Sequence, residues 1–142
     1  MICQVEICIK TKQSLVSDRQ LKNYTRAILK YLRQDGEVEI ILVGRAMMRR
    51  LNLDYRGVDR VTDVLSFAWQ EDKILLGQSL GQIYLCPAQI VGQAKEFDVS
   101  AREELKRMLA HGILHLLGYD HQDKKRAEKM FSIQEKLVKI CQ

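Results

Sequence analysis

Apolar and polar residues alternate at the start of the chain and then change to a helical period. In residues 3–9 every second side chain is apolar, and this period of two predicts a strand with one buried face. Ser17 and Gln20 have the spacing of a capping box, and apolar residues recur three or four apart over residues 21–32. A helix is therefore predicted to follow the first strand, with Gly36 marking its end.

The middle of the chain combines short apolar runs with one basic segment. Residues 38–43 are almost all apolar, which predicts a strand near the centre of a sheet, and residues 45–53 predict a basic helix. Residues 64–69 and 82–86 predict a third and a fourth strand. The pattern over residues 71–81 is poor and predicts a loop or hairpin between them.

Three helices are predicted in the last third of the chain. Pro87 suits the first position of a helix that continues to about residue 97. Ser100 and Glu103 have capping-box spacing before the next helix, and a last amphipathic helix covers residues 123–140. Strands and helices follow one another without strict alternation. The pattern predicts an α+β fold in which a small mixed sheet of about four strands packs with about five helices.

Length and composition favour one domain over residues 1–142. Apolar residues make up 46% of the 142 residues, which is ordinary for a globular protein, and the single proline gives no sign of a linker. The formal net charge is +5. A basic balance favours polyanionic partners such as nucleic acid, although solvated surface charge explains it equally simply.

Cysteine usage and hydropathy favour a cytoplasmic protein with no membrane association. The four cysteines form no C-x-x-C pair, and the N-terminal residues lack the pattern of a secretory signal. The longest apolar runs are far shorter than the roughly 20 residues that span a bilayer. Reduced thiols in the cytoplasm are therefore expected.

The three histidines of the chain lie within eleven residues. His111 and His115 are four apart, so on a helix their side chains lie on the same face one turn apart. Gly118 can end the helix in a left-handed conformation, and the returning chain can bring His121 to the same point. Three imidazoles suit one Zn²⁺ ion and leave its fourth position for water, which is the pattern of catalytic zinc. The sequence thus predicts a zincin-like three-histidine metal site.

Two alternatives to a hydrolytic zinc site remain open at this point. A closed structural site would need a fourth protein ligand, for which Asp120, Asp123 and Cys86 are the candidates. The histidine spacing is also that of metzincin peptidases, which carry a glutamate as general base directly after the first histidine. Gly112 occupies that position here, which disfavours the peptidase mechanism and favours phosphodiester cleavage with a nearby cation.

An arginine-rich segment supplies candidates for that cation. Five arginines and no lysine lie between residues 45 and 60, and the planar guanidinium matches phosphate in a bidentate manner. Arg56 is expected in a turn outside regular structure, where functional residues are common. Arg45, Arg49 and Arg60 are candidates for substrate binding, with a solvated helix face as the alternative for Arg45 and Arg49. Tyr55 and Trp69 can stack on bases, although ordinary packing at the end of an apolar strand is favoured for Trp69. Asp63 can orient a histidine or cap a turn.

These residues resemble the YbeY family of bacterial endoribonucleases. The resemblance rests on Leu51-Asn52-Leu53-Asp54-Tyr55-Arg56-Gly57, Thr62-Asp63-Val64-Leu65-Ser66-Phe67, Leu80-Gly81-Gln82-Ile83 and the run from His111 to His121. It implies one zinc ion on the three histidines and a functional role for Arg56. It also implies cleavage of single-stranded RNA in the 3′-end maturation of 16S ribosomal RNA and in ribosome quality control. The implied partners are the 16S ribosomal RNA precursor and proteins of the small ribosomal subunit.

Two positions depart from the family pattern. Gln82, a candidate for supporting a metal ligand, stands where the family usually has aspartate. If that carboxylate does acid–base work or orients a ligand, the neutral amide cannot do so, and weaker activity is expected. Ala68 stands where the family often has proline, a change expected to affect only a local turn. Two functional alternatives are kept: a metzincin-like peptidase without the usual glutamate, and a non-catalytic RNA- or ribosome-binding factor stabilised by zinc.

Overall fold

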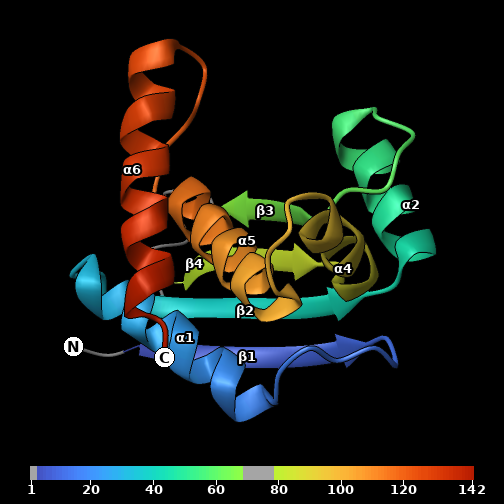
Figure 1. The fold of residues 1–142 in the computed structure, drawn as a ribbon, viewed down its shortest axis with the longest axis horizontal. Coiled ribbons are helices and arrows are strands. Elements are labelled where there is room, and N and C mark those ends of the chain that lie inside the picture. Colours follow the sequence, from blue (N-terminus) through green and yellow to red (C-terminus); the bar gives the residue numbers. More distant parts are fainter. Residues whose placement is uncertain (1–2, 69–78) are drawn as a thin grey trace.

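The four strands form one mixed sheet in the order β1-β2-β4-β3 (Figure 1). The computed structural model describes residues 3–68 and 79–142. The strands are β1 (Cys3–Lys10), β2 (Gly36–Val43), β3 (Val64–Ala68) and β4 (Ser79–Leu85). β1 and β4 both run parallel to β2, whereas β3 pairs antiparallel with β4. The predicted α+β fold with a small mixed sheet is confirmed.

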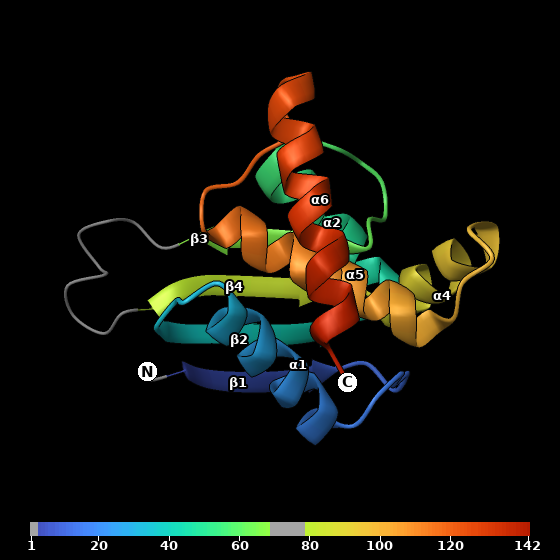
Figure 2. The same cartoon turned by 60° about the vertical axis from the view of Figure 1, so that its left-hand side comes forward.

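Most of the helices lie on one face of this sheet and pack on one another. The helices of the described residues are α1 (Asp18–Tyr31), α2 (Arg45–Arg56), α4 (Pro87–Glu96), α5 (Ala101–Leu116) and α6 (Lys124–Ile140). α1 packs on β1, α5 packs on β3 and β4, and α6 lies across α5 (Figure 2). No helix in the described ranges is long and apolar enough to cross a membrane.

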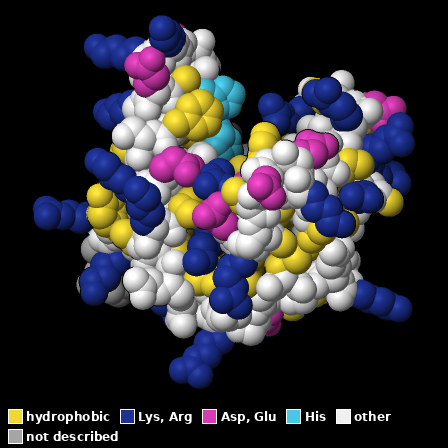
Figure 3. Space-filling view, viewed as in Figure 1, with side chains coloured by type: hydrophobic (Ala, Val, Ile, Leu, Met, Phe, Trp, Pro, Cys, Tyr) yellow, Lys and Arg dark blue, Asp and Glu magenta, His cyan; other side chains and the backbone are white. Residues whose placement is uncertain are grey.

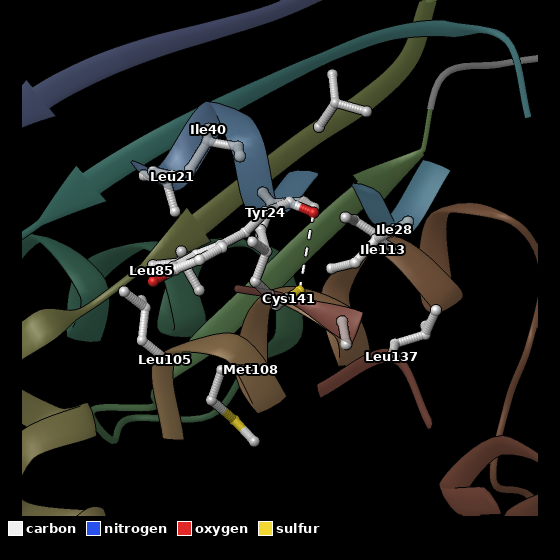
Figure 4. Close-up of a cluster of buried hydrophobic side chains, with 14 of the residues drawn as sticks. Leu21, Tyr24, Ile28, Ile40, Leu85, Leu105, Met108, Ile113, Leu137 and Cys141 are labelled. Atoms are coloured by element: carbon white, nitrogen blue, oxygen red, sulfur yellow. Dashed lines mark hydrogen bonds between the residues drawn. The ribbon is translucent and has the colours of Figure 1, made fainter. Parts of the chain in front are cut away.

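The main core lies between the sheet and the helices α1, α5 and α6. Fully buried side chains such as Tyr24, Ile40, Leu85 and Ile113 fill it (Figure 4). The thiol of Cys141, just after α6, donates to the carbonyl oxygen of Tyr24 at 3.9 Å and joins the end of the chain to α1. The four cysteines are free thiols, as predicted. This core holds α5, the helix that carries two histidines, against the sheet.

A second, smaller cluster forms on the opposite face of the sheet. Ile41 and Val43 of β2 point to this face, because successive residues of a strand alternate between faces. Met48 and Leu51 of α2 pack against them and fix α2 at this end of the sheet.

Helix α2 is three residues longer than the sequence pattern predicts. The expected end was residue 53, but the helix continues through Tyr55 and Arg56 and ends at Gly57. Gly57 has a φ of 72° and its N–H is bonded to the carbonyls of Asn52 and Leu53, a left-handed cap that glycine adopts without steric cost. The prediction that Arg56 lies outside regular structure is therefore wrong: Arg56 is the last residue of a helix.

The fourth strand begins earlier than predicted. It starts at Ser79 and includes Gly81. The backbone of Gly81 lies so close to β3 that a Cβ atom would collide with the carbonyl oxygen of Phe67. Such a glycine weakens the strand pattern, which explains why the sequence placed it in a loop. Trp69 and most of the predicted loop over residues 71–81 lie outside the described residues.

The caps predicted at α1 and α5 are present, and α6 also begins at a capping residue. Ser17 accepts from the Gln20 N–H and the Gln20 side chain accepts from the Ser17 N–H, so the capping box is complete. Ser100 accepts from the Glu103 N–H and Asp123 accepts from the Arg126 N–H. These caps fix where α1, α5 and α6 begin.

Candidate metal centre and cleft

The three histidines meet at the C-terminal end of α5. The Nε2 atoms of His111 and His115, one turn apart, lie 3.0 Å from each other. The helix ends at Leu116, and Gly118 with a φ of 95° turns the chain back so that His121 joins them. One ring nitrogen from each histidine lies within 4.8 Å of the other two. The predicted meeting of the three histidines at one point is therefore confirmed.

A buried glutamine fixes the ring of His111. Nδ1 of His111 lies 2.8 Å from Oε1 of Gln134 on α6, and because this oxygen only accepts, Nδ1 carries the proton. Nε2 of His111 therefore keeps its lone pair, and it points toward the other two histidines. The next residue of α6, Glu135, accepts from Arg107 of α5 and so ties the two helices together beside this contact.

Gln134→Leu is expected to weaken metal binding about 10- to 100-fold, because the residues that orient a ligating histidine contribute that much to affinity. Leucine preserves the apolar packing of α6 but cannot accept the Nδ1 proton. A competition titration of zinc against a chromophoric chelator measures the change, with Gln134→Glu as the matched variant that keeps an acceptor. Equal zinc affinity of the leucine variant and the wild type would contradict the orienting role.

Burial keeps two of the histidines in the neutral form that binds metals. Burial is the largest of the effects that lower the pKa of His115 to about 4, and the neighbouring histidines and Arg56 act in the same direction. Burial also lowers the pKa of His111, against the opposing effect of the hydrogen bond to Gln134. Protons therefore do not compete for these two rings near neutral pH.

The donor geometry fits zinc. Two ligands of a tetrahedral ion with Zn–N distances of about 2.0–2.1 Å are about 3.3 Å apart, close to the 3.0 Å between the two Nε2 atoms. In the described ranges no thiol or carboxylate joins the three histidines as a fourth ligand within that 4.8 Å group. Of the three proposed fourth ligands, Cys86 is fully buried before α4, Asp123 caps α6 and Asp120 contacts Arg126. The arrangement therefore supports a site with three protein ligands and a fourth coordination position left for water.

The histidines line a cleft of about 560 Å³, which we call the histidine cleft. Its walls are β3, the end of α5 and the α5–α6 connection, and Arg56 reaches it from α2. Figure 3 shows the corresponding notch between α6 and α2, with histidine side chains exposed on its wall beside α6. The cleft is thus formed by segments far apart in the sequence.

Gly112 faces the sheet and not the metal. A Cβ atom at this position would lie 3.0 Å from Ile83 Cγ2 and 3.1 Å from Ser66 Oγ, and the Ser66 hydroxyl donates to the Gly112 carbonyl. This close approach leaves no room for the glutamate that metzincins carry here. Close packing against the sheet therefore explains the glycine at this position. The general base that the peptidase alternative requires is absent here.

The structure brings Arg56 and Tyr55 to the histidine cleft or its edge. Arg56 lines the cleft, and its charge lowers the pKa of His115. Tyr55 is 68% exposed and packs edge-to-face on Phe67, which lines the cleft, with 5.1 Å between ring centroids. An exposed aromatic ring beside a charged cleft is suited to stacking on a base.

Arg45 and Arg49 lie away from the cleft. Arg45 starts α2 about 16 Å from its last residue, Arg56, and donates to the Ala88 carbonyl at 3.1 Å. Arg49 forms an ion pair with Asp59 at 2.7 Å. The spacing along α2 therefore separates these arginines from the histidines.

Asp63 and Gln82 have partners other than the histidine ligands, and Arg60 lies outside the histidine cleft. Asp63 lines the cleft and accepts from the N–H of Val64 and from Gln93, and no hydrogen bond among the described residues joins it to a histidine. Gln82 contacts Glu39 at 3.2 Å on the sheet face opposite α5, which corrects the expectation that it supports a ligand. Arg60 lines a neighbouring cavity.

Gln134 is the functional residue that the sequence interpretation missed. It lies among Met130, Leu137 and Val138 on the buried face of α6. A polar side chain at an apolar position of an amphipathic helix is a detectable signal, because such a group needs a hydrogen-bond partner. The pattern alone did not reveal that the partner is His111.

Comparison with known proteins gives the family. The chain matches the family model described as Endoribonuclease YbeY over residues 6–142. The chain belongs to the endoribonuclease YbeY family. The predicted family, a family of RNA-cleaving hydrolases, is thereby confirmed.

Individual relatives agree with this assignment. The Endoribonuclease YbeY of Thermodesulfovibrio yellowstonii is 42% identical over 71% of this chain and 64% of its own length. That of Thermotoga maritima is 40% identical over 83% of this chain and 76% of its own length. The solution structure of TM1509 from Thermotoga maritima superposes with a TM-score of 0.68 at 34% identity, covering 97% of this chain and 89% of that one.

Proposed function

We propose that this protein is a zinc-dependent endoribonuclease that cuts single-stranded RNA. The observation that carries the proposal is the position of Arg56, which lines the same cleft as the three-histidine cluster. A metal site and a guanidinium on two walls of one cleft are what hydrolysis of a phosphodiester needs. The family name adds that the relatives act on RNA and cut it internally.

The residues of this chain divide the work between holding the metal and holding the phosphate. His111, His115 and His121 would hold one zinc ion, which when bound supplies a Lewis acid and a water with a pKa of about 7. Gln134 holds the proton on Nδ1 of His111 and so leaves Nε2 free to bind a metal. Arg56 donates to the phosphate oxygens and stabilises the charge that develops on them during attack.

We further propose that the substrate is the 3′ end of the 16S ribosomal RNA precursor, handled by residues 1–142 as one domain in the cytoplasm. The resemblance to the family motifs supports this substrate, and the +5 net charge is consistent with a polyanion. Tyr55 would favour single strands, because only unpaired bases can stack on a side chain. Contact with proteins of the small ribosomal subunit belongs to the same proposal.

Metal removal tests this proposal and the structural-zinc alternative together. We expect the zinc-loaded protein to cut a labelled single-stranded RNA but not the matching duplex, and the chelated protein to lose at least about 100-fold in rate and recover with zinc. We also expect the chelated protein to stay folded by circular dichroism, because the main core does not include the histidines. Unfolding on chelation would favour a structural ion, and cleavage unaffected by chelation would contradict the proposal.

A further inference from the structure

A second cavity adjoins the histidine cleft. It has a volume of about 340 Å³ and shares Arg56, Thr62 and Asp63 with the cleft. Arg60 on the α2–β3 connection and Gln93 on α4 lie on its walls, and we call it the arginine lobe. Its volume is at the lower end of the range of about 300–1,000 Å³ that is usual for small-molecule sites.

The cations of the arginine lobe lack acidic partners. Among residues 3–68 and 79–142, neither Arg56 nor Arg60 forms an ion pair. Two other arginines of the same segment do: Arg49 pairs with Asp59, and Arg50 lies 3.8 Å from Asp54. The guanidinium groups that face the cavity are therefore the ones available to an anion.

The α4 wall of the lobe presents hydrogen-bond acceptors in a fixed orientation. Nε2 of Gln93 donates to the carboxylates of Asp63, at 2.9 Å, and of the buried Glu104. These two bonds prevent the amide from flipping, so Oε1 is left as an acceptor. Oε1 has no hydrogen-bond partner in the described part of the chain and is not among its buried unpaired atoms, so it reaches solvent. Oε1 of Gln93 and the neighbouring carboxylate of Asp63 both accept hydrogen bonds, so this wall favours a ligand that presents N–H donors to it.

We propose that the arginine lobe is a nucleotide subsite, occupied by the nucleotide next to the bond that is cut. The phosphate between the two nucleotides lies between Arg56 and Arg60, and the base meets Gln93 and Asp63 with its amino group. Cytosine and adenine fit this wall better than uracil, which carries a carbonyl oxygen where cytosine carries its amino group. This inference rests on the proposed function for the identity of the ligand as RNA.

The test measures binding, so its outcome does not depend on cleavage. Two fluorescein-labelled RNA hexamers, one of cytidine only and one of uridine only, are titrated with the zinc-loaded protein. The fluorescence anisotropy is extrapolated to the time of mixing, so that any cleavage does not affect the measured affinity. We expect the cytidine hexamer to bind about three- to tenfold more tightly, the value of one hydrogen bond. Equal affinities would overturn the proposed base contact.

Three variants separate the contacts. Gln93→Met, which keeps the side-chain length, is expected to remove the preference for cytidine over uridine. Arg60→Ala is expected to weaken both hexamers about three- to tenfold and to lower the slope of log affinity against log salt by about one. Arg26→Ala, an exposed arginine of α1, removes the same charge outside the lobe and is expected to change neither.

The contrary results are equally specific. If Arg60→Ala binds both hexamers like the wild type, the lobe is not a subsite, even where the wild type cuts RNA. If Gln93→Met unfolds, the preference of the wild type and the effect of Arg60→Ala still decide the proposal. Absence of cleavage with the cytidine preference intact would reject the proposed function and leave the lobe as a binding site.

Discussion

Replacing Arg56 with alanine is expected to lower the rate of RNA cleavage about 10²- to 10³-fold while the fold and the metal content stay unchanged. The expected size is that of losing one group that stabilises charge in the transition state. Arg56 is exposed at the end of α2 and has no ion pair within the described residues, so its removal leaves no buried charge behind. Cleavage of a labelled single-stranded RNA and zinc content by atomic absorption measure the two quantities.

The control for this prediction is a set of proteins purified side by side. Arg26→Ala removes an exposed arginine from α1 and should cut like the wild type, and contaminating ribonuclease would appear in every preparation. Arg56→Lys should recover part of the rate, because it restores the charge but not the planar fork. If Arg56→Ala cuts as fast as Arg26→Ala, Arg56 has no part in the reaction.

The sequence was sufficient for the features set by local pattern. Alternation predicted the first strand, capping residues predicted the starts of α1 and α5, and the histidine spacing together with Gly118 predicted the metal cluster. Each of these depends on residues within about eleven positions of one another, where helix and turn geometry relate spacing to direction. The end of α2 was misplaced because the polar residues before Gly57 look like a turn, although helix propensity and the glycine cap extend it.

Features that depend on tertiary packing could not be read in the same way. The orienting contact joins His111 to Gln134 across two helices, 23 positions apart. Gln82 stands at the variant position of a family motif, yet strand alternation places it on the face away from the histidines. Gly112 could be read as a missing base, but the packing of Ser66 and Ile83 against it shows why a glycine is needed. Spacing identified the ligands, and the fold identified what supports them.

Replacing His115 with alanine is expected to weaken zinc binding more than about 100-fold and to abolish cleavage. Loss of a residue that only orients a ligand costs about 10- to 100-fold, and loss of a ligand must cost more. His115 is central to the cluster, since its Nε2 lies 3.0 Å from that of His111 and its ring centroid lies 5.4 Å from that of His121. Zinc competition titration and RNA cleavage measure the two effects.

The thermal stability of the metal-free variant decides how the loss is to be understood. His115 is neutral in the folded protein down to a pH of about 4, whereas in the unfolded chain it takes up a proton near pH 6.5. The metal-free wild type should therefore lose stability as the pH falls from 6.5 toward 4, and His115→Ala should lose less over the same interval. At pH 8, where the ring is neutral in both states, the two metal-free proteins should melt at similar temperatures. A variant that is already unfolded at pH 8 would show that His115 supports the fold as well as the metal, and its loss of cleavage would then say nothing about the reaction.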